Sequence, residues 1–153
     1  MQKIIKFCLS FFDYFTQKKI LIKLKDVFKH KQTISVIDIG AHEGEFISFI
    51  IKNFKTSMAY CFEPNPKVFK VLFKKFNNMK NIQLINSGAS NITDKIMFNE
   101  NIESSSSSIN DLNKDSNYYK KKFFLLNFLS SNEVTKKIEI KEKKLNEFIL
   151  KNK

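Results

Sequence analysis

Four carboxylates gather around one glycine-containing turn of this chain: Asp38, Glu43, Glu45 and Glu63. The first three lie in or beside segment 38–44 (DIGAHEG), and Glu63 ends the next apolar run. Like charges placed this close together would repel a phosphate group and favour a cation. The residue types at this turn therefore predict binding of a positively charged small molecule without phosphates.

The spacing of the glycines excludes two common nucleotide-binding patterns. A dinucleotide fingerprint needs glycine two and five residues after Gly40, where this chain has His42 and Glu45. A P-loop needs Gly-Lys after four spacer residues, where Glu45 and Phe46 stand. What remains is Asp-x-Gly-x-x-x-Gly, followed about 20 residues later by Glu63, the spacing at which a carboxylate meets a ribose diol.

All glycines and prolines of the chain fall into three short segments, each at the end of an apolar run: 38–44, 63–66 and 86–90. Glycine allows turns and close approaches that a Cβ forbids, and proline fixes φ. Ligands of open α/β sheets bind beyond the carboxyl ends of the strands. The pattern therefore predicts a cofactor cleft along one edge of a sheet.

Apolar periodicity supplies the elements that must position this cleft. Residues 34–39, 58–62 and 82–85 are predicted as buried strands, and 46–54 and 66–76 as helices between them. Strands that alternate with helices through short connections pair in parallel. The predicted fold class is α/β, a Rossmann-like three-layer sandwich with parallel strands 1–3 and additional C-terminal strands, in a sheet expected to be incomplete.

The flanking regions carry weaker patterns. Residues 1–30 are predicted as an N-terminal helical cap on the sheet, with a helix lying on a membrane surface as the alternative. Residues 31–153 are predicted as the ligand-binding domain. Within its C-terminal half we expect strands at 94–99 and 134–141, a loop at 103–117, and helices at 118–129 and 145–150.

Composition limits the partners of the chain. Its 153 residues suit one domain, and its net charge of +12 comes from 27 basic residues, all of them lysine. Because arginine, the usual reader of guanine, is absent, we expect a solvated basic surface and no nucleic-acid partner. Cys61 is expected to be a small buried thiol, and no metal site is predicted. Lys6 and Asp13 interrupt the first apolar stretch, which predicts a cytoplasmic protein without stable membrane insertion.

The segments around the turn resemble the class I S-adenosylmethionine-dependent methyltransferases, and more narrowly the FkbM family. Residues 36–46 are similar to the first motif of that family, Asp-x-Gly-Ala-Asn-x-Gly, and 62–66 to the end of its second strand. Segment 86–90 falls where the third strand of the family meets adenine. The serine run 104–108 and segment 144–148 (KLNEF) resemble its Ser-Ser-Leu and Thr-Leu-Asp-Asp-Phe segments.

Two departures from the family pattern stand out. His42 occupies the position of the more common asparagine, and Asn146 that of an aspartate. The strand with Lys-Ile-Asp-x-Glu-Gly that usually follows has no counterpart before Lys153. The chain is therefore expected to hold only the N-terminal portion of such an enzyme, with a partner chain or self-association completing the sheet.

The resemblance implies a cofactor, S-adenosyl-L-methionine, and a role for each matched residue. Asp38 would organise the loop and the methionyl ammonium, or else cap the following helix. Gly40 would let the backbone approach the cofactor, Gly44 would let the helix pack against the first strand, and Glu63 would bind the ribose. The full set of implied cofactor-binding residues is Asp38, Gly40, Ala41, His42, Gly44, Glu63, Pro64, Ser87 and Gly88, with Ser87 and Gly88 at the adenine; a plain turn is the alternative for these last two.

The predicted function is methyl transfer to a hydroxyl group of a sugar or secondary metabolite, with the catalytic residues unknown. Two alternatives stay open: a truncated, non-catalytic module or gene fragment that binds S-adenosylmethionine, and a basic protein of the membrane surface.

Overall fold

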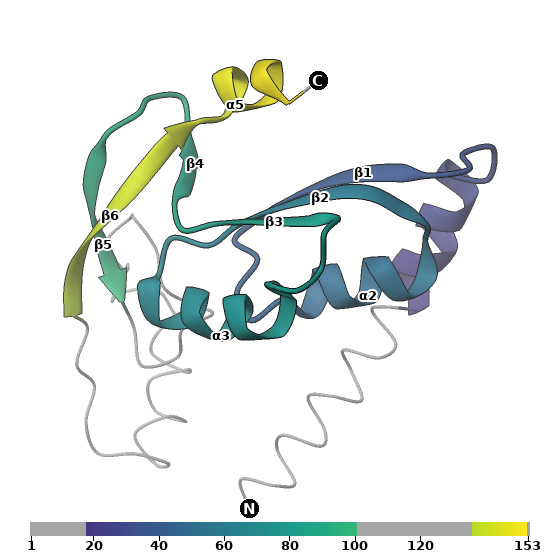
Figure 1. Cartoon of the computed structure of the whole chain (residues 1–153), viewed down its shortest axis with the longest axis horizontal. Helices are drawn as coiled ribbons and strands as arrows, with labels where there is room; N and C mark the ends of the chain where they lie inside the picture. The colour runs from purple at the N-terminus through teal and green to yellow at the C-terminus, as the bar shows by residue number, and fades with distance from the viewer. Residues whose placement is uncertain (1–17, 101–135, 153) are drawn as a thin grey trace, which may run out of the picture.

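A parallel three-stranded sheet lies at the centre of the structure, a computed structural model that describes residues 18–100 and 136–152 (Figure 1). Its strands are β1 (Ile34–Ile39), β2 (Thr56–Phe62) and β3 (Ile82–Ile85), in the order β1-β2-β3. Both neighbouring pairs run parallel. The predicted α/β class and the parallel pairing of the first three strands are thereby confirmed.

Helices α2 (Glu45–Asn53) and α3 (Pro66–Phe76) cover one face of this sheet (Figure 1). Pro66 suits the first turn of α3, where a backbone N–H has no helical partner. The Asn65 side chain caps the same turn by accepting a hydrogen bond from the Lys67 N–H at 3.0 Å. The buried core between helices and sheet consists of Ile34, Ala41, Ile47, Ile50, Ala59, Cys61, Leu72, Phe76 and Ile82.

The opposite face of the sheet carries helix α5 (Leu145–Lys151) (Figure 1). Its Phe148 ring meets the rings of Tyr60 and Phe62 edge-on, at centroid distances of 5.2 and 5.0 Å. Edge-to-face pairs of this kind are favourable beyond the apolar area that they bury. Helices on both faces give the predicted three layers, and Phe148 is the residue that attaches the KLNEF segment to the sheet.

The C-terminal strands form a second sheet instead of extending the first. Its strands are β4 (Gly88–Ser90), β5 (Lys95–Glu100) and β6 (Lys136–Lys144), in the order β4-β6-β5. β6 runs parallel to β4 and antiparallel to β5. The strands expected at 94–99 and 134–141 therefore exist with shifted ends, whereas residues 88–90 form a short strand.

Residues 18–27 are helical and pack beside the first sheet. Leu24 and Phe28 contact the core cluster, and the Phe28 ring lies 5.9 Å from the Phe54 ring, edge-on. The division of the chain at residue 30 stays a prediction. The expected loop at 103–117 and the helix at 118–129 lie outside the described residues, as does the first part of the cap.

Within residues 18–100 and 136–152, no helix is both long and apolar enough to cross a bilayer.

Cys61 is expected to resist alkylation in the native protein. Its side chain is fully buried in β2, where it pairs with Asp38 of β1. Burial, and then the Asp38 carboxylate, raise the pKa of the Cys61 thiol to about 12, and only the thiolate is a strong nucleophile. Peptide mass spectrometry after iodoacetamide treatment should show labelling of Cys61 only in urea. Rapid labelling without urea would contradict the buried position.

Candidate functional site

The turn after β1 holds its shape through three residues with left-handed backbones. Gly40, His42 and Gly44 have φ values of 78°, 51° and 86°. Glycine adopts this region without cost, and histidine is among the few other residues enriched there. Asparagine, the residue that the resemblance implies at position 42, tolerates the same region. The backbone of the turn thus explains which residue types occur at position 42.

Glu63 joins this turn to the beginning of α3. Its two carboxylate oxygens accept hydrogen bonds from the backbone N–H groups of His42 at 2.9 Å and Asn65 at 2.8 Å. The Asn86 side chain donates to the Glu63 carbonyl oxygen at 2.8 Å. Glu63 is 6% exposed. Segments 38–44 and 63–66 therefore meet at the Glu63 carboxylate, and the segment after β3 is held to the backbone of the same residue.

Asp38 supplies a buried carboxylate oxygen that lacks a partner. Among the described residues, its Oδ2 accepts no hydrogen bond, and the residue is 9% exposed. The alternative role as a helix cap is wrong, because the N-cap of α2 is Gly44 and no side chain caps that helix. An unsatisfied buried acceptor costs about 1–3 kcal/mol, so a ligand that reaches this oxygen has free energy to gain.

Burial sets the titration of both carboxylates. It raises the pKa of Asp38, and the charges of Glu45 and Glu63 add to that rise. Burial likewise raises the pKa of Glu63, against the hydrogen bonds from the Asn65 and His42 N–H groups and the His42 charge. In both cases the environment disfavours the ionised form. A cation placed between the two carboxylates would favour their ionised form again.

The two glycines of the turn have different surroundings. A Cβ on Gly40 would meet no atom within 4 Å, so open space lies beside the backbone there. A Cβ on Gly44 would lie 2.3 Å from Phe76 Cε2 and 2.9 Å from Leu72 Cδ1. Gly44 therefore lets the start of α2 pack against α3, which the sequence did not predict; packing of this helix against the first strand through Gly44 stays a prediction.

The third predicted segment is bound to the second sheet. Ser87 is 1% exposed, and its hydroxyl is shared between the carbonyl oxygens of Gly88 at 2.9 Å and Lys141 at 3.0 Å. Its N–H donates to the Ile85 carbonyl at 3.0 Å. Gly88 pairs with Glu142 of β6. A contact of Ser87 and Gly88 with adenine stays a prediction.

The remaining predicted residues lie on the same turns. Ala41 is buried, and its N–H shares the Phe62 carbonyl oxygen with the Gly40 N–H, each at 2.9 Å. The Pro64 carbonyl accepts from Asn86 Nδ2 at 3.3 Å. Sequence patterns missed the anchoring role of Asn86. The available signal was the position of this amide: Asn86 directly follows β3, and the neighbouring strand β2 is followed by the buried Glu63.

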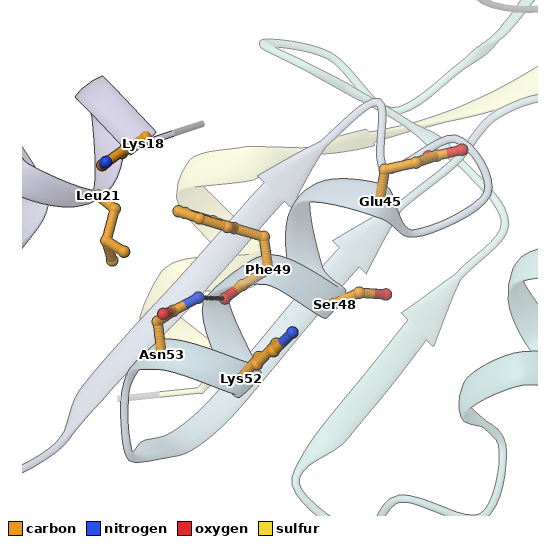
Figure 2. A pocket seen from close by; sticks show the side chains of 7 residues that line it. All are labelled: Lys18, Leu21, Glu45, Ser48, Phe49, Lys52 and Asn53. Carbon is orange, nitrogen blue, oxygen red and sulfur yellow. Dashed lines mark hydrogen bonds between the residues drawn. The ribbon is translucent and has the colours of Figure 1, made fainter. Parts of the chain in front are cut away.

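A separate hollow of about 490 Å³ lies between the helix at 18–27 and α2 (Figure 2). Glu45 stands at one end of α2 and Asn53 at the other, where Asn53 Nδ2 donates to the Phe49 carbonyl oxygen at 2.8 Å. Asp38 and Glu63 do not line this hollow. Its lining residues are Lys18, Leu21, Glu45, Ser48, Phe49, Lys52 and Asn53.

In the part of the chain that the structure describes, no three His, Cys, Asp or Glu side chains gather in a way that could hold a metal ion.

A solved methyltransferase structure is similar to part of this chain. No family model and no curated protein matches this chain. Among solved structures, it is similar to the crystal structure of the methyltransferase FkbM from Methylobacillus flagellatus KT, with a TM-score of 0.37 and 22% sequence identity. The match covers 42% of this chain and only 20% of that chain. The chemistry of the site therefore has to follow from its own carboxylates and glycines.

Proposed function

We propose that this chain binds S-adenosylmethionine at the carboxyl ends of β1 and β2 and forms the cofactor half of a methyltransferase. The observation that carries the proposal is the buried, unpartnered Oδ2 of Asp38. Glu63 disfavours a second anion there, and Gly40 leaves open space beside the turn. This combination fits a ligand with a positive charge and a ribose, and it disfavours a pyrophosphate.

Three parts of the site fit three parts of the cofactor. Asp38 would accept hydrogen bonds from the methionyl ammonium, and the Gly40–Ala41 backbone would lie against the methionyl chain. Glu63 would bind the ribose hydroxyls, since each carboxylate oxygen keeps acceptor capacity beyond its single backbone bond. When bound, the cofactor supplies an electrophilic methyl group on a sulfonium ion. The chain would hold it in a fixed orientation, which is the main requirement of an in-line displacement.

A hydroxyl of a sugar or secondary metabolite is our proposed acceptor, on the strength of the family resemblance. No side chain is assigned as a general base. A cytoplasmic location and the absence of a nucleic-acid partner also remain predictions.

Calorimetric titration of the purified chain tests the proposal. S-adenosylmethionine and S-adenosylhomocysteine should both bind, and NAD should not, because its pyrophosphate would meet the acidic turn. Binding without turnover of any hydroxyl acceptor would favour the non-catalytic module. If neither sulfur compound binds, the proposal is wrong.

Alanine at position 63 is expected to weaken S-adenosylmethionine binding about 10- to 100-fold, because a hydrogen bond to a charged group contributes about 1.5–3 kcal/mol. Glu63→Gln retains one acceptor oxygen, and its affinity for S-adenosylmethionine should lie between those of the wild type and Glu63→Ala. Glu147→Ala removes a carboxylate from exposed α5 and serves as the matched control. Affinity that is equal in all three variants, measured by the same titration, would exclude a ribose contact at Glu63.

A further inference from the structure

Strand β1 has an open edge. Among the described strands it pairs only with β2. The Ile34 N–H donates to the carbonyl oxygen of Lys55, just before β2, at 3.0 Å, and the N–H of Gly40, just after β1, donates to the Phe62 carbonyl oxygen at 2.9 Å. The backbone N–H and C=O groups of successive residues in a strand point to opposite edges. Those of even-numbered residues in β1 point toward β2, and those of odd-numbered residues point away from it. The N–H and C=O groups of Ser35, Ile37 and Ile39 therefore point to the open edge.

This edge lacks the usual protection against pairing. Proteins commonly protect edge strands with lysine, proline or a bulge that twists the strand away. Residues 34–39 contain no lysine and no proline, in a chain with 27 basic residues. The register with β2 shifts only at the start of the strand, between Ile34 and Ser35, and residues 35–39 pair regularly. On the face that α5 partly covers, Ile37 is 39% and Ile39 56% exposed. Apolar side chains and unpaired backbone groups together form a surface that fits another strand.

The charges at the two ends of β1 favour one occupant and one direction. Segment 29–31 (KHK) precedes the strand, and the partly exposed Glu43 and Glu45 follow its end. Each end keeps its sign although ion-pair contacts form at both: Lys29–Asp26 at 3.6 Å at the basic end, and Lys75–Glu43 at 3.5 Å and His42–Glu45 at 3.4 Å at the acidic end. A parallel copy would place like charges together. An antiparallel copy places the basic end of each strand beside the acidic end of the other, so the favourable contact occurs twice in the dimer.

We propose that a second copy of this chain docks on β1 in the antiparallel direction, across a two-fold axis. The resulting continuous sheet has the strand order β3-β2-β1-β1-β2-β3. The occupant is a copy because the strand is complementary to itself in charge, and the same surface then serves both subunits. This inference is independent of the proposed cofactor.

The register follows from the outward-facing residues. With Ile37 opposite the partner's Ile37, Ser35 lies opposite the partner's Ile39, and every outward-facing residue forms a hydrogen-bonded pair. Asp38 then lies opposite the partner's Val36, so the two aspartates do not face each other. The same register brings the partner's Lys31 toward the acidic turn.

Sedimentation velocity of the full chain tests the dimer. The wild type should sediment as a dimer and Ile37→Lys as a monomer. Circular dichroism should show that Ile37→Lys is folded. Met97→Lys is the matched control, since Met97 is 55% exposed on β5, the edge of the second sheet, and this variant should remain dimeric. Lys31→Glu places like charges at both ends of β1 and should weaken the dimer at low salt without altering the strand. A monomeric wild type, with the edge free or covered by another part of the chain, would overturn the proposal.

Cysteine cross-linking tests the register in a Cys8→Ser background. Ile37→Cys should form an intermolecular disulfide, because a directly opposed pair has a Cα separation within the usual range. Ile39→Cys should not, since four residues of offset separate the two copies by about 13 Å, beyond the reach of a disulfide. Cross-linking at 39 but not at 37 would exclude this register.

Discussion

Asparagine at position 38 is expected to stabilise the ligand-free protein and to weaken its binding of S-adenosylmethionine strongly. In the absence of a ligand, the ionised Asp38 carboxylate is disfavoured by burial and by the charges of Glu45 and Glu63. An uncharged amide of nearly the same shape removes that disfavoured charge. Binding should fall about 30- to 5,000-fold, because loss of one partner from a buried charged pair costs about 2–5 kcal/mol.

The pH dependence of stability provides an independent check. A carboxyl group whose pKa is raised in the folded state binds more protons when folded than when unfolded. The stability of the ligand-free protein should therefore fall as pH rises from the unfolded pKa of Asp38 through its raised folded pKa, and should recover as pH is lowered. Urea unfolding over a pH series measures this slope, which should become shallower in Asp38→Asn. A variant less stable than the wild type at neutral pH would contradict this account of Asp38.

Alanine at position 44 should cause the largest loss of stability among the substitutions considered. A left-handed φ costs a residue other than glycine about 1–3 kcal/mol, and here φ is 86°. The added Cβ would also overlap Phe76 at 2.3 Å, and overpacking costs about 1–3 kcal/mol more. We therefore expect the free energy of unfolding in urea to fall by about 2–6 kcal/mol.

Gly88→Ala is the matched control for this substitution. The nearest atom to a Cβ at Gly88 is Glu142 Cγ at 3.6 Å, an ordinary contact, and the backbone there is not left-handed. Alanine at position 88 should leave the urea midpoint close to that of the wild type. Equal losses at both positions would mean that the contact of Gly44 with α3 is not the cause.

Local patterns predicted the first sheet because its strands and helices are short-range features. The β-branched run at 34–39 and the run at 82–85 are bounded by turn residues, and Pro66 marks the start of α3. The turn was found for the same reason, since Gly40 and Gly44 occupy backbone conformations that glycine favours.

The second sheet was less predictable because long-range contacts create it. Residues 88–90 (GAS) have no strand pattern of their own, and they become β4 through pairing with β6. The Ser87 hydroxyl reaches the Lys141 carbonyl across much of the chain. The sequence also could not predict that Asp38 Oδ2 lacks a hydrogen-bond partner, because this depends on the positions of all the residues around it in the folded chain.

The two backbone bonds to Glu63 also have a kinetic consequence. Because the His42 and Asn65 amides hold this carboxylate in place before any ligand arrives, little side-chain freedom remains to be lost on binding. The same amides can exchange hydrogen with solvent only when the bonds open. Ligand binding should therefore slow hydrogen exchange at the His42 and Asn65 amides to the same extent. Equal slowing would mean that the turn after β1 and the start of α3 open and close as one unit.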